Sequence, residues 1–221
     1  MAESVFITGG TGYIGQRVAS ALCARGHRVR ALVRVGSERK APPGCEVVVG
    51  DPFDCGTFAH RVGEGDTFIQ LLGVPHPSPA KARQFKDIDL RSATESIAAA
   101  STAGVDHFIY VSVAQPAPVM QAYQQARGKA ERTLDLSGLR RTIVRPWYVL
   151  GPGHRWPYVL LPMYWVLERV PSTRAGAQRL GLVTINEMVA ALVHAVEHPP
   201  QRARIVEVPD IRAAARPQSA N

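Results

Sequence analysis

The 221-residue sequence predicts an α/β fold with a doubly wound parallel sheet, and three observations support this prediction. Strand-like and helix-like segments alternate along the chain, which is the pattern of βαβ units. A glycine cluster follows the first strand-like segment and leads directly into a helical one. With 46% hydrophobic and 20% charged residues, the chain has a globular composition, which excludes disordered, collagenous and coiled-coil proteins.

Short segments rich in β-branched and aromatic residues are predicted as strands. The expected strands cover residues 4–8, 27–34, 45–50, 66–72, 105–113, 141–145 and 205–208. The segment at 105–113, which reads VDHFIYVSV, has the strongest strand character. Because helical segments separate most of these strands, we expect right-handed crossovers between parallel strands.

Helices are predicted where apolar residues recur at helical spacing. The expected helices cover residues 13–25, 91–103, 122–137 and 185–198. Each of the first three ends at a glycine, which is the usual residue at a helix C-terminus. The last begins with a capping box, in which Thr184 is the N-cap and Glu187 occupies the third helical position.

The predicted organisation is one domain over residues 1–208, with no linker between two cores. Residues 147–185 are expected to form a small C-terminal cap region. Residues 209–221 are largely polar and are expected to form a disordered tail.

The glycine cluster carries the strongest functional signal. Gly10, Gly12 and Gly15 match the spacing G-x-G-x-x-G, after a strand and at the start of a helix. The first two glycines allow a tight turn close to a pyrophosphate, and the third allows close packing of helix and strand. Helix N-terminal amides favour the anionic diphosphate. The motif therefore predicts a Rossmann-type dinucleotide-binding domain.

The end of the second predicted strand indicates which dinucleotide is bound. Sites for NAD usually carry Asp or Glu there to bond the ribose hydroxyls. This sequence has no acidic residue between Glu3 and Glu38, and its strand ends at Arg34. An arginine can bond a 2′-phosphate with two donors, so we expect NADP(H) in preference to NAD(H). The alternative leaves Arg34 as a solvated surface charge.

Several motifs occur together in a characteristic order: TGGTGYIG, VRALVR, VVVGDPFD, LLG, FIYVSV and IVRP. With this set, the chain resembles the atypical short-chain dehydrogenase/reductases, in the NmrA-like and complex-I-accessory-subunit-like branch, over about residues 4–208. Besides Arg34, the resemblance implies a cofactor site made of Gly9, Thr11, Gly12, Tyr13, Ile14, Gly15, Asp51, Pro52, Leu72, Gly73 and Pro146. Asp51 can also be read as a turn acid that follows a strand.

The resemblance also implies a catalytic serine at Ser112. Reductases of this superfamily add a Tyr-x-x-x-Lys pair, in which tyrosine transfers a proton and lysine lowers its pKa. Here Tyr123 is followed at that spacing by Arg127, and Lys129 lies on a different side of the helix. Ser112, Tyr123 and Arg127 are the catalytic candidates. The alternative makes Tyr123 an ordinary residue of the cleft wall.

Two classes of function remain open. The first is an oxidoreductase that uses NADPH to reduce a small apolar carbonyl or quinone. The aromatic residues clustered at 147–165 suit an apolar substrate, although core packing, or a peripheral membrane or protein-complex contact through residues 154–169, explains them too. The second class is a non-catalytic NADP(H)-binding redox sensor or complex-assembly protein. The departure from Tyr-x-x-x-Lys favours this second class.

Charge and composition narrow the partners and the location. The net charge of +8 suits anionic partners, but the basic residues are dispersed and match no nucleic-acid-binding motif, so no nucleic acid is expected. The oligomeric state is expected to be monomer or homodimer. With no signal peptide apparent, a cytoplasmic location and three reduced, buried cysteines are expected. His194 and His198 form half a metal site at most, so no metal is expected.

Overall fold

The computed structural model describes residues 2–152, 165, 167 and 169–216. A seven-stranded parallel sheet lies at its centre, in the order β3-β2-β1-β4-β5-β6-β9. The strands are β1 (Ser4–Thr8), β2 (Arg28–Val33), β3 (Glu46–Val49), β4 (Thr67–Gln70), β5 (His107–Val111), β6 (Arg141–Val144) and β9 (Ala203–Val206). The strand order reverses between β1 and β4, which is where doubly wound sheets bind ligands.

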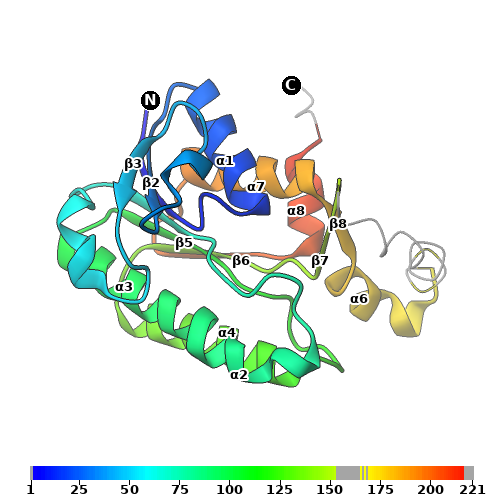
Figure 1. Cartoon of the computed structure of the whole chain (residues 1–221). Helices are drawn as coiled ribbons and strands as arrows, with labels where there is room; N and C mark the ends of the chain where they lie inside the picture. The colour runs from blue at the N-terminus through cyan, green and yellow to red at the C-terminus, as the bar shows by residue number, and fades with distance from the viewer. Residues whose placement is uncertain (1, 153–164, 166, 168, 217–221) are drawn as a thin grey trace.

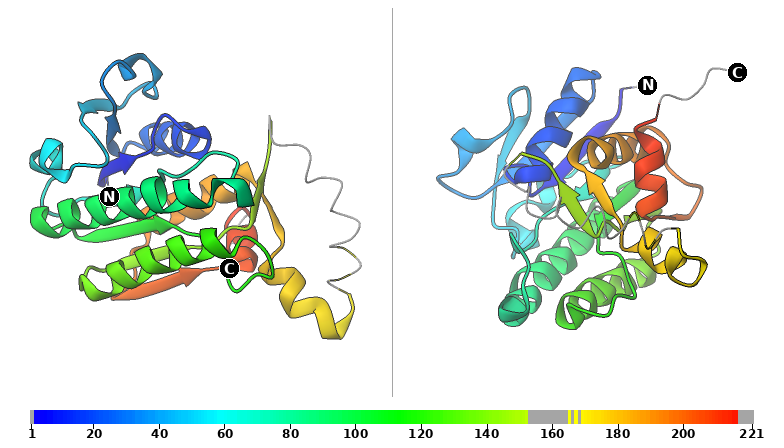
Figure 2. Two further views of the ribbon diagram at one scale, coloured as in Figure 1. Left: turned by 60° about the horizontal axis from the view of Figure 1, so that its bottom comes forward. Right: turned by 90° about the vertical axis from the view of Figure 1, so that its right-hand side faces the viewer.

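Helices cover both faces of this sheet (Figure 1). One face carries α1 (Tyr13–Ala24), α7 (Ile185–Glu197) and α8 (Val208–Ala214). The other carries α3 (Arg91–Ala103) and α4 (Gln121–Leu136), which lie side by side in Figure 2. Because both faces are covered, the central strands are mostly apolar on both sides, and polar strand residues such as Thr8, Gln70 and Thr142 are buried as well.

Matching positions on neighbouring strands build the two layers of the core. Phe6, Phe68 and Phe108 face α3 and α4, with ring centroids 5.2 Å apart across β1 and β4 and 5.1 Å apart across β4 and β5. The isoleucines that follow them on each strand face α1 and α7. The register places equivalent side chains side by side, which holds the carboxyl ends of the strands level.

Shorter elements complete the described chain. They are η1 (Glu38–Lys40), η2 (Cys55–Thr57), η3 (Ala59–Arg61), η4 (Pro79–Lys81), α2 (Ala82–Gln84), the π-helical turn η5 (Phe85–Leu90), β7 (Tyr148–Leu150), α6 (Pro171–Arg179) and β8 (Leu182–Thr184). Strands β7 and β8 pair in parallel as a separate two-stranded sheet. With α6, they lie at one end of the main sheet, within the segment expected to form the cap (Figure 1).

The structure confirms the predicted fold class and corrects some details. The last strand of the sheet, β9, begins two residues before its expected start, and the sheet of β7 and β8 was not predicted. The disordered tail expected from residue 209 is wrong for its first part. Residues 208–214 form helix α8, because Val208 and Ile211 are fully buried against α7. Residues 217–221 lie outside the described residues.

The sequence also allowed a peripheral membrane or protein-complex contact through residues 154–169. Most of the segment 154–169, including Trp156, lies outside the described residues. Trp165 is exposed, and the guanidinium carbon of Arg169 lies 3.4 Å from its ring centroid. Within the described ranges, no helix is both long enough and apolar enough to cross a membrane.

Candidate functional site

The loop after β1 is shaped by glycines that approach other backbone atoms. Gly9 has a left-handed φ of +72°, and a Cβ on it would lie 2.7 Å from the backbone nitrogen of Leu72. A Cβ on Gly15 would collide with the Gly9 carbonyl oxygen and lie 2.8 Å from the Cα of Gly10. Only glycine fits these two positions, so the loop lies tightly between α1 and the chain that follows β4.

Helix α1 begins with an open N-terminus. Its N-cap is Gly12, which provides no side-chain cap, and the first helical turn carries no acidic residue. The first amides of a helix have no partner within the helix, so here they can hold an external anion. Together with the helix dipole, this arrangement fits the pyrophosphate of a dinucleotide.

A cavity of about 410 Å³ lies where the carboxyl ends of β1, β2, β3 and β4 come together. The predicted cofactor residues in its wall are Gly9, Thr11, Gly12, Arg34, Pro52, Leu72 and Gly73. The other residues of the wall are Leu32, Val33, Ser37, Phe53, Leu71, Pro75 and Ile88. The glycine loop and Arg34 thus face one space, at the position where doubly wound folds bind ligands.

Arg34 follows β2 directly and lies exposed at the rim of this cavity. Its carbonyl accepts a hydrogen bond from the Ser37 amide at 2.9 Å, so the chain turns at this point. The carboxylate of Glu38 accepts from the Gly36 amide at 3.0 Å. As far as the chain is described, the cavity wall contains a cation and no carboxylate.

Asp51 and Pro146, which were also expected to contact the cofactor, take part in contacts within the chain. The Asp51 carboxylate accepts from the Phe53 amide at 2.9 Å, which is the geometry of a turn acid after a strand. Pro146 is buried beyond β6, and its carbonyl accepts from the Ala114 amide at 2.9 Å. Contact of either residue with a cofactor stays a prediction.

Tyr13, Ile14 and Gly15 form the first turn of α1. Gly15 is buried beneath the glycine loop, and Ile14 packs against the apolar core below the helix. The Tyr13 ring centroid lies 4.4 Å from the guanidinium carbon of Arg17. These side chains are turned to the protein, so a pyrophosphate would meet their backbone amides.

Arg127 is buried on α4, and its guanidinium lies against Gly73, on the side of the cavity wall that faces the protein interior. Its Nη2 donates to the Asp89 carboxylate at 2.6 Å, and its Nη1 donates to the Val111 carbonyl at 2.7 Å. A Cβ on Gly73 would collide with Nη2 and lie 2.8 Å from Asp89 Oδ1. The guanidinium is therefore fixed, and the backbone of one glycine separates it from the cavity.

Tyr123 lies one helical turn before Arg127, as the spacing predicts. Its ring centroid is 4.8 Å from that of Phe85 and 5.2 Å from the guanidinium carbon of Arg127. Burial raises the pKa of Tyr123, and the charge of Arg127 offsets only part of that effect. Because Asp89 also raises this pKa, the phenol keeps its proton at neutral pH.

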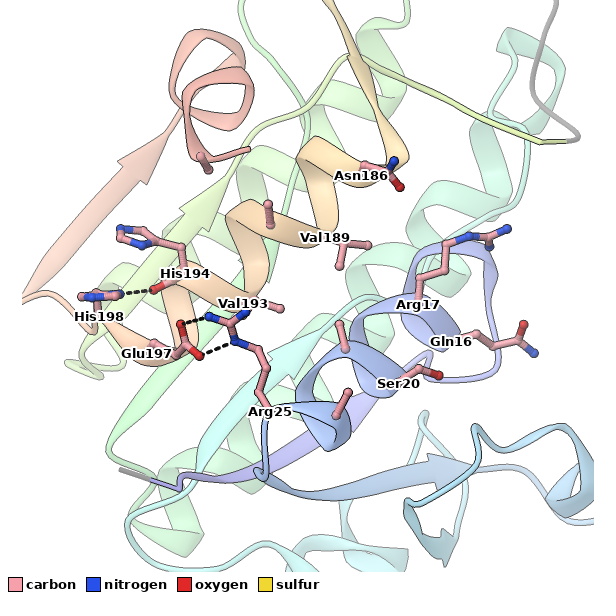
Figure 3. Close-up of a pocket in the computed structure, with 14 residues that line it drawn as sticks. Gln16, Arg17, Ser20, Arg25, Asn186, Val189, Val193, His194, Glu197 and His198 are labelled. Carbon is pink, nitrogen blue, oxygen red and sulfur yellow. Dashed lines mark hydrogen bonds and ion pairs between the residues drawn. The ribbon is translucent and has the colours of Figure 1, made fainter. Parts of the chain in front are cut away.

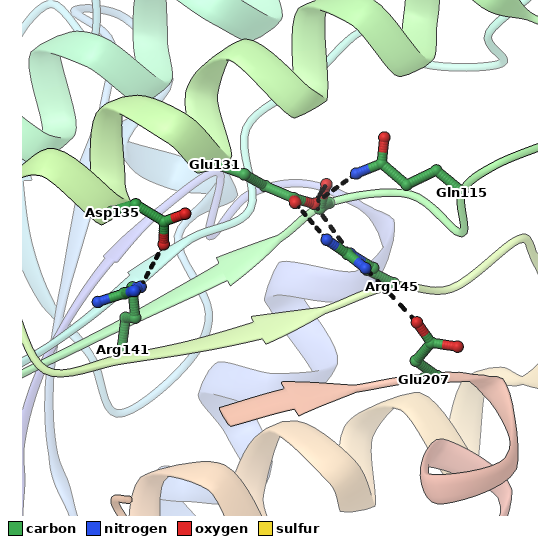
Figure 4. Close-up of polar contacts among 7 residues, drawn as sticks. Gln115, Glu131, Asp135, Arg141, Arg145 and Glu207 are labelled. Carbon is green, nitrogen blue, oxygen red and sulfur yellow. Dashed lines mark hydrogen bonds and ion pairs between the residues drawn. The ribbon is translucent and has the colours of Figure 1, made fainter. Parts of the chain in front are cut away.

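Ser112 follows β5 and contacts a polar cluster between α4 and β6, of which Figure 4 shows Gln115, Glu131 and Arg145. Its hydroxyl donates to Glu131 at 2.5 Å, and Gln115 donates to the same carboxylate at 3.0 Å. Arg145 binds both oxygens of Glu131, with its Nε at 3.1 Å and its Nη2 at 2.5 Å. The Ser112 proton is thus engaged by a buried, ion-paired carboxylate.

The structure therefore brings only two of the three catalytic candidates into contact. Tyr123 and Arg127 pack together, as expected from their spacing. Ser112 is instead bound to Glu131, which lies two helical turns beyond Tyr123 on α4. Any shared catalytic role of Ser112 and Tyr123 stays a prediction.

A second, larger groove of about 1130 Å³ lies on the outer face of the molecule, between α1 and α7 (Figure 3). Its wall includes Ala21, Val189 and Val193, and an ion pair of 2.7 Å between Arg25 and Glu197 crosses it. The residues predicted for the cofactor or for catalysis lie outside this wall. The groove is therefore separate from the candidate site.

Two histidines line one end of this groove. His194 and His198 stack with ring centroids 4.2 Å apart on one side of α7. Within the described part of the chain, no group of three His, Cys, Asp or Glu side chains is arranged to hold a metal ion.

Asp89 and Glu131 are the residues that sequence reasoning missed. They pair with Arg127 and Ser112, from positions 38 and 19 residues away in the sequence. One signal was available for Glu131. It follows Arg127 by four residues, so it lies on the same helix face, and a carboxylate on a buried face requires a partner. Asp89 lies in the π-helical turn η5, which no simple spacing predicts.

Comparison with known proteins gives a consistent result. A family model described as NAD(P)H-binding matches residues 9–158, which is more than half of the chain. A ceramide reductase from Caulobacter vibrioides is 28% identical over 218 residues, covering 94% of this chain and 65% of that protein.

A 3 beta-hydroxysteroid dehydrogenase/Delta 5-->4-isomerase from Mycobacterium tuberculosis is 31% identical over 114 residues. The match covers 49% of this chain and 31% of that enzyme, so the chain spans about a third of the length of this curated relative.

Among solved structures, the Bordetella bronchiseptica enzyme WbmH in complex with NAD+ superimposes with a TM-score of 0.68 at 20% identity. The match covers 94% of this chain and 76% of that one. At this level of identity, the similarity supports the fold only.

Proposed function

Because the chain belongs to the NAD(P)H-binding family, as an atypical short-chain dehydrogenase/reductase with a Rossmann fold, we propose that it is an NADPH-dependent reductase of an apolar carbonyl compound. The observation that carries this proposal is the cavity at the end of β1 and β4. The glycine loop with its open helix N-terminus lies on one side of it, and Arg34 lies at its rim.

The preference for NADPH is supported by charge at the end of β2. The adenosine 2′-phosphate is a dianion, and Arg34 is an exposed cation on the cavity rim. The cavity wall offers no carboxylate for the two ribose hydroxyls of NAD, within the described residues. Arginine matches a phosphate with two parallel donors, which supports NADPH as the dinucleotide.

The direction of reaction is supported by the state of Tyr123. Bound NADPH supplies hydride to a carbonyl carbon, and the resulting alkoxide requires a proton. Because burial raises the pKa of Tyr123, its phenol stays protonated and suits the role of proton donor. A base that abstracts a proton from an alcohol would need the opposite shift.

An apolar substrate is supported by the relatives and by the sequence. The ceramide reductase and the steroid dehydrogenase are both named for lipid-like compounds. The aromatic residues of segment 147–165 suit a substrate of this kind, such as a small apolar ketone or a quinone.

The polar contacts of Ser112 and of Arg127 favour a second candidate function. The Ser112 hydroxyl donates to Glu131, and Arg127 is fixed by Asp89 and the Val111 carbonyl. In this arrangement Ser112 and Arg127 are held by the protein itself. A non-catalytic NADP(H)-binding sensor or assembly protein, of the NmrA-like kind, would not require these two side chains to be released from their protein partners.

Binding of the cofactor is tested by titration of NADPH and NADH into the wild type, Arg34→Ala and Arg202→Ala. Loss of the Arg34 contact is expected to weaken NADPH binding by about tenfold or more and to leave NADH binding unchanged. Arg202 is an exposed arginine just before β9, so its replacement is the matched control. Equal affinity of Arg34→Ala and wild type for NADPH would remove the preference.

Catalysis is tested by NADPH oxidation against a panel of apolar ketones, aldehydes and quinones. The reductase is expected to turn over at least one of them, with kcat lowered about 100-fold or more in Tyr123→Phe. Tight NADPH binding without turnover of any compound would favour the sensor. Unchanged turnover in Tyr123→Phe would assign the proton to another group.

A further inference from the structure

Two of the three cysteines lie together at the outer edge of the cofactor-binding half. Cys23 is near the end of α1, and Cys45 comes directly before β3, 22 residues later. Their Sγ atoms are 3.6 Å apart. Both thiols are free and only partly buried, whereas the sequence predicted buried thiols.

The surrounding backbone holds the two thiols in this position. Gly44 has a left-handed φ of +82°, and a Cβ on it would lie 3.5 Å from the Cβ of Cys23. The Cys45 amide donates to the Pro42 carbonyl at 3.3 Å, which closes a tight turn against α1. The thiols are thus brought together by a packed turn on a helix.

We propose that Cys23 and Cys45 form a redox site, which closes to an intramolecular disulfide in the presence of a peroxide. A disulfide has an S–S length of about 2.05 Å, so the two sulfurs must approach by about 1.5 Å. Rotation of two partly exposed side chains supplies a movement of this size. The proposal is independent of the proposed reductase activity.

The oxidation balances with hydrogen peroxide as the oxidant. One of the two thiols loses its proton, and the thiolate attacks one peroxide oxygen, so that the O–O bond breaks and a sulfenic acid and hydroxide form. The hydroxide takes up the released proton and becomes the first water. The sulfur of the other cysteine then displaces the sulfenic oxygen, which leaves with the second thiol proton as the second water, and the S–S bond forms. In total, two thiols and one peroxide give one disulfide and two waters, and a dithiol reverses the change.

The proximity of the two sulfurs makes the product independent of which thiol reacts first. Oxidation of either cysteine places a sulfenic acid beside the other sulfur, so the same disulfide forms.

The cross-link would enclose the segment that carries Arg34. The chain between the two cysteines contains all of β2 and the turn that follows Arg34. Gln16 of α1 already donates to the Lys40 carbonyl in this segment, at 3.4 Å. Oxidation would thus join the end of α1 covalently to the start of β3, and would close a loop that contains Arg34.

Cys55 provides an internal control. It is also free and partly buried, but its amide donates to Glu95 at 3.0 Å, and the structure records no thiol beside it. An oxidation that depended only on exposure would modify Cys55 as well. An oxidation that depends on proximity would leave it reduced.

The full-length protein is treated with hydrogen peroxide, alkylated and digested, and its peptides are mapped by mass spectrometry. Trypsin leaves Cys45 and Cys55 in one peptide, so a protease that cuts after Glu46 is added to separate them. The expected product links Cys23 to Cys45 and leaves Cys55 alkylated. The expected melting temperature of the oxidised protein is higher by about 5 to 10 °C, and a dithiol restores the original value.

The variants decide between a specific site and general oxidation. Cys55→Ser is expected to show the full shift, whereas Cys23→Ala and Cys45→Ala show none. A disulfide that includes Cys55, a link between two chains, or sulfinic acid at Cys23 or Cys45 without a bridge would overturn the proposal. The wild-type peptide map decides this even where a variant fails to fold.

Discussion

The carboxyl edge of the sheet is built in two different ways along its length. Around β1, β2 and β4, the described wall consists mostly of glycines and apolar residues, with the small polar residues Thr11 and Ser37 and the exposed Arg34. Around β5 and β6, arginine–carboxylate pairs fill the space, with Asp89 on Arg127 and Glu131 on Arg145. We call these the open half and the filled half.

The open half is suited to binding a ligand, whereas the filled half contains the residues expected to take part in catalysis. In the open half, the amides of α1 and the Arg34 side chain can meet a ligand without breaking an existing ion pair. In the filled half, Ser112 and Arg127 are already bonded to protein groups. A ligand can therefore bind in the open half without displacing an existing contact. A reaction in the filled half would have to use Ser112 and Arg127 while they stay bonded to these protein groups.

The largest expected effect comes from Gly15→Ala in the open half. The new Cβ would collide with the Gly9 carbonyl, and the backbone there cannot move away. We expect a loss of about 4 kcal/mol in the free energy of unfolding, measured by urea denaturation, and no measurable NADPH binding. Gly176→Ala on α6 is the control, because the space around that position is open. Native behaviour of Gly15→Ala would show that the loop is looser than described.

In the filled half, Asp89→Asn is expected to lower the free energy of unfolding by about 3 to 4 kcal/mol. The change leaves Arg127 buried without its counter-charge. Because the Asp89 charge raises the pKa of Tyr123, that pKa is also expected to fall, as measured by ultraviolet titration. Asp87→Asn is the control, since Asp87 pairs with Arg83 on the exposed surface. Equal losses in the two variants would contradict the importance of the buried pair.

A pH dependence is expected from His107, which is buried on β5 and bonded to Thr142 on β6. Burial, assisted by Arg140, lowers the pKa of His107 to about 4 from its ordinary 6.5. The unfolded chain therefore binds the proton first as the pH falls. Stability is lost between about pH 6.5 and pH 4, by about 3 kcal/mol in total.

The contribution of His107 is isolated by comparing urea denaturation of the wild type and His107→Gln at pH 7 and pH 4.5. The glutamine has no ionising group, so its loss of stability on acidification should be smaller by most of that amount. Identical pH dependence in both proteins would assign the effect to other groups.

The smallest effect concerns the start of α7, which contrasts with the open start of α1. Thr184 accepts from the Glu187 amide at 3.2 Å, while the Glu187 carboxylate accepts from the Thr184 amide at 2.6 Å. Thr184→Ala is expected to lower the free energy of unfolding by about 1 kcal/mol, measured by urea denaturation. Thr184→Ser keeps the oxygen and should retain most of the stability. A neutral Thr184→Ala would show that packing alone fixes this helix.

Local patterns explain how much of this molecule could be predicted from its sequence. Glycine spacing and strand composition identified the loop after β1, and the capping residues identified the start of α7. Arg34 could be placed at the rim because strand ends in a parallel sheet share one edge. These features depend on neighbours in the sequence, which a single chain displays directly.

The features that could not be predicted depend on contacts between residues that are distant in the sequence. The partners of Arg127 and Ser112 were missed because Asp89 and Glu131 reach them only after the chain has folded. Strands β7 and β8 contain three residues each and lie 34 positions apart at their starts, so neither shows a recognisable pattern alone. Asp51 had two interpretations, and only the folded turn shows its bond to the Phe53 amide.

The thin wall at Gly73 has a thermodynamic consequence. The backbone of this glycine forms part of the cavity on one side and contacts the Arg127–Asp89 pair on the other. A dinucleotide bound in the cavity would replace solvent beside that wall, and would thereby change the electric field that acts on the proton of Tyr123. Linkage is reciprocal, so any shift that the cofactor causes in the pKa of Tyr123 must return as an equal dependence of cofactor affinity on pH.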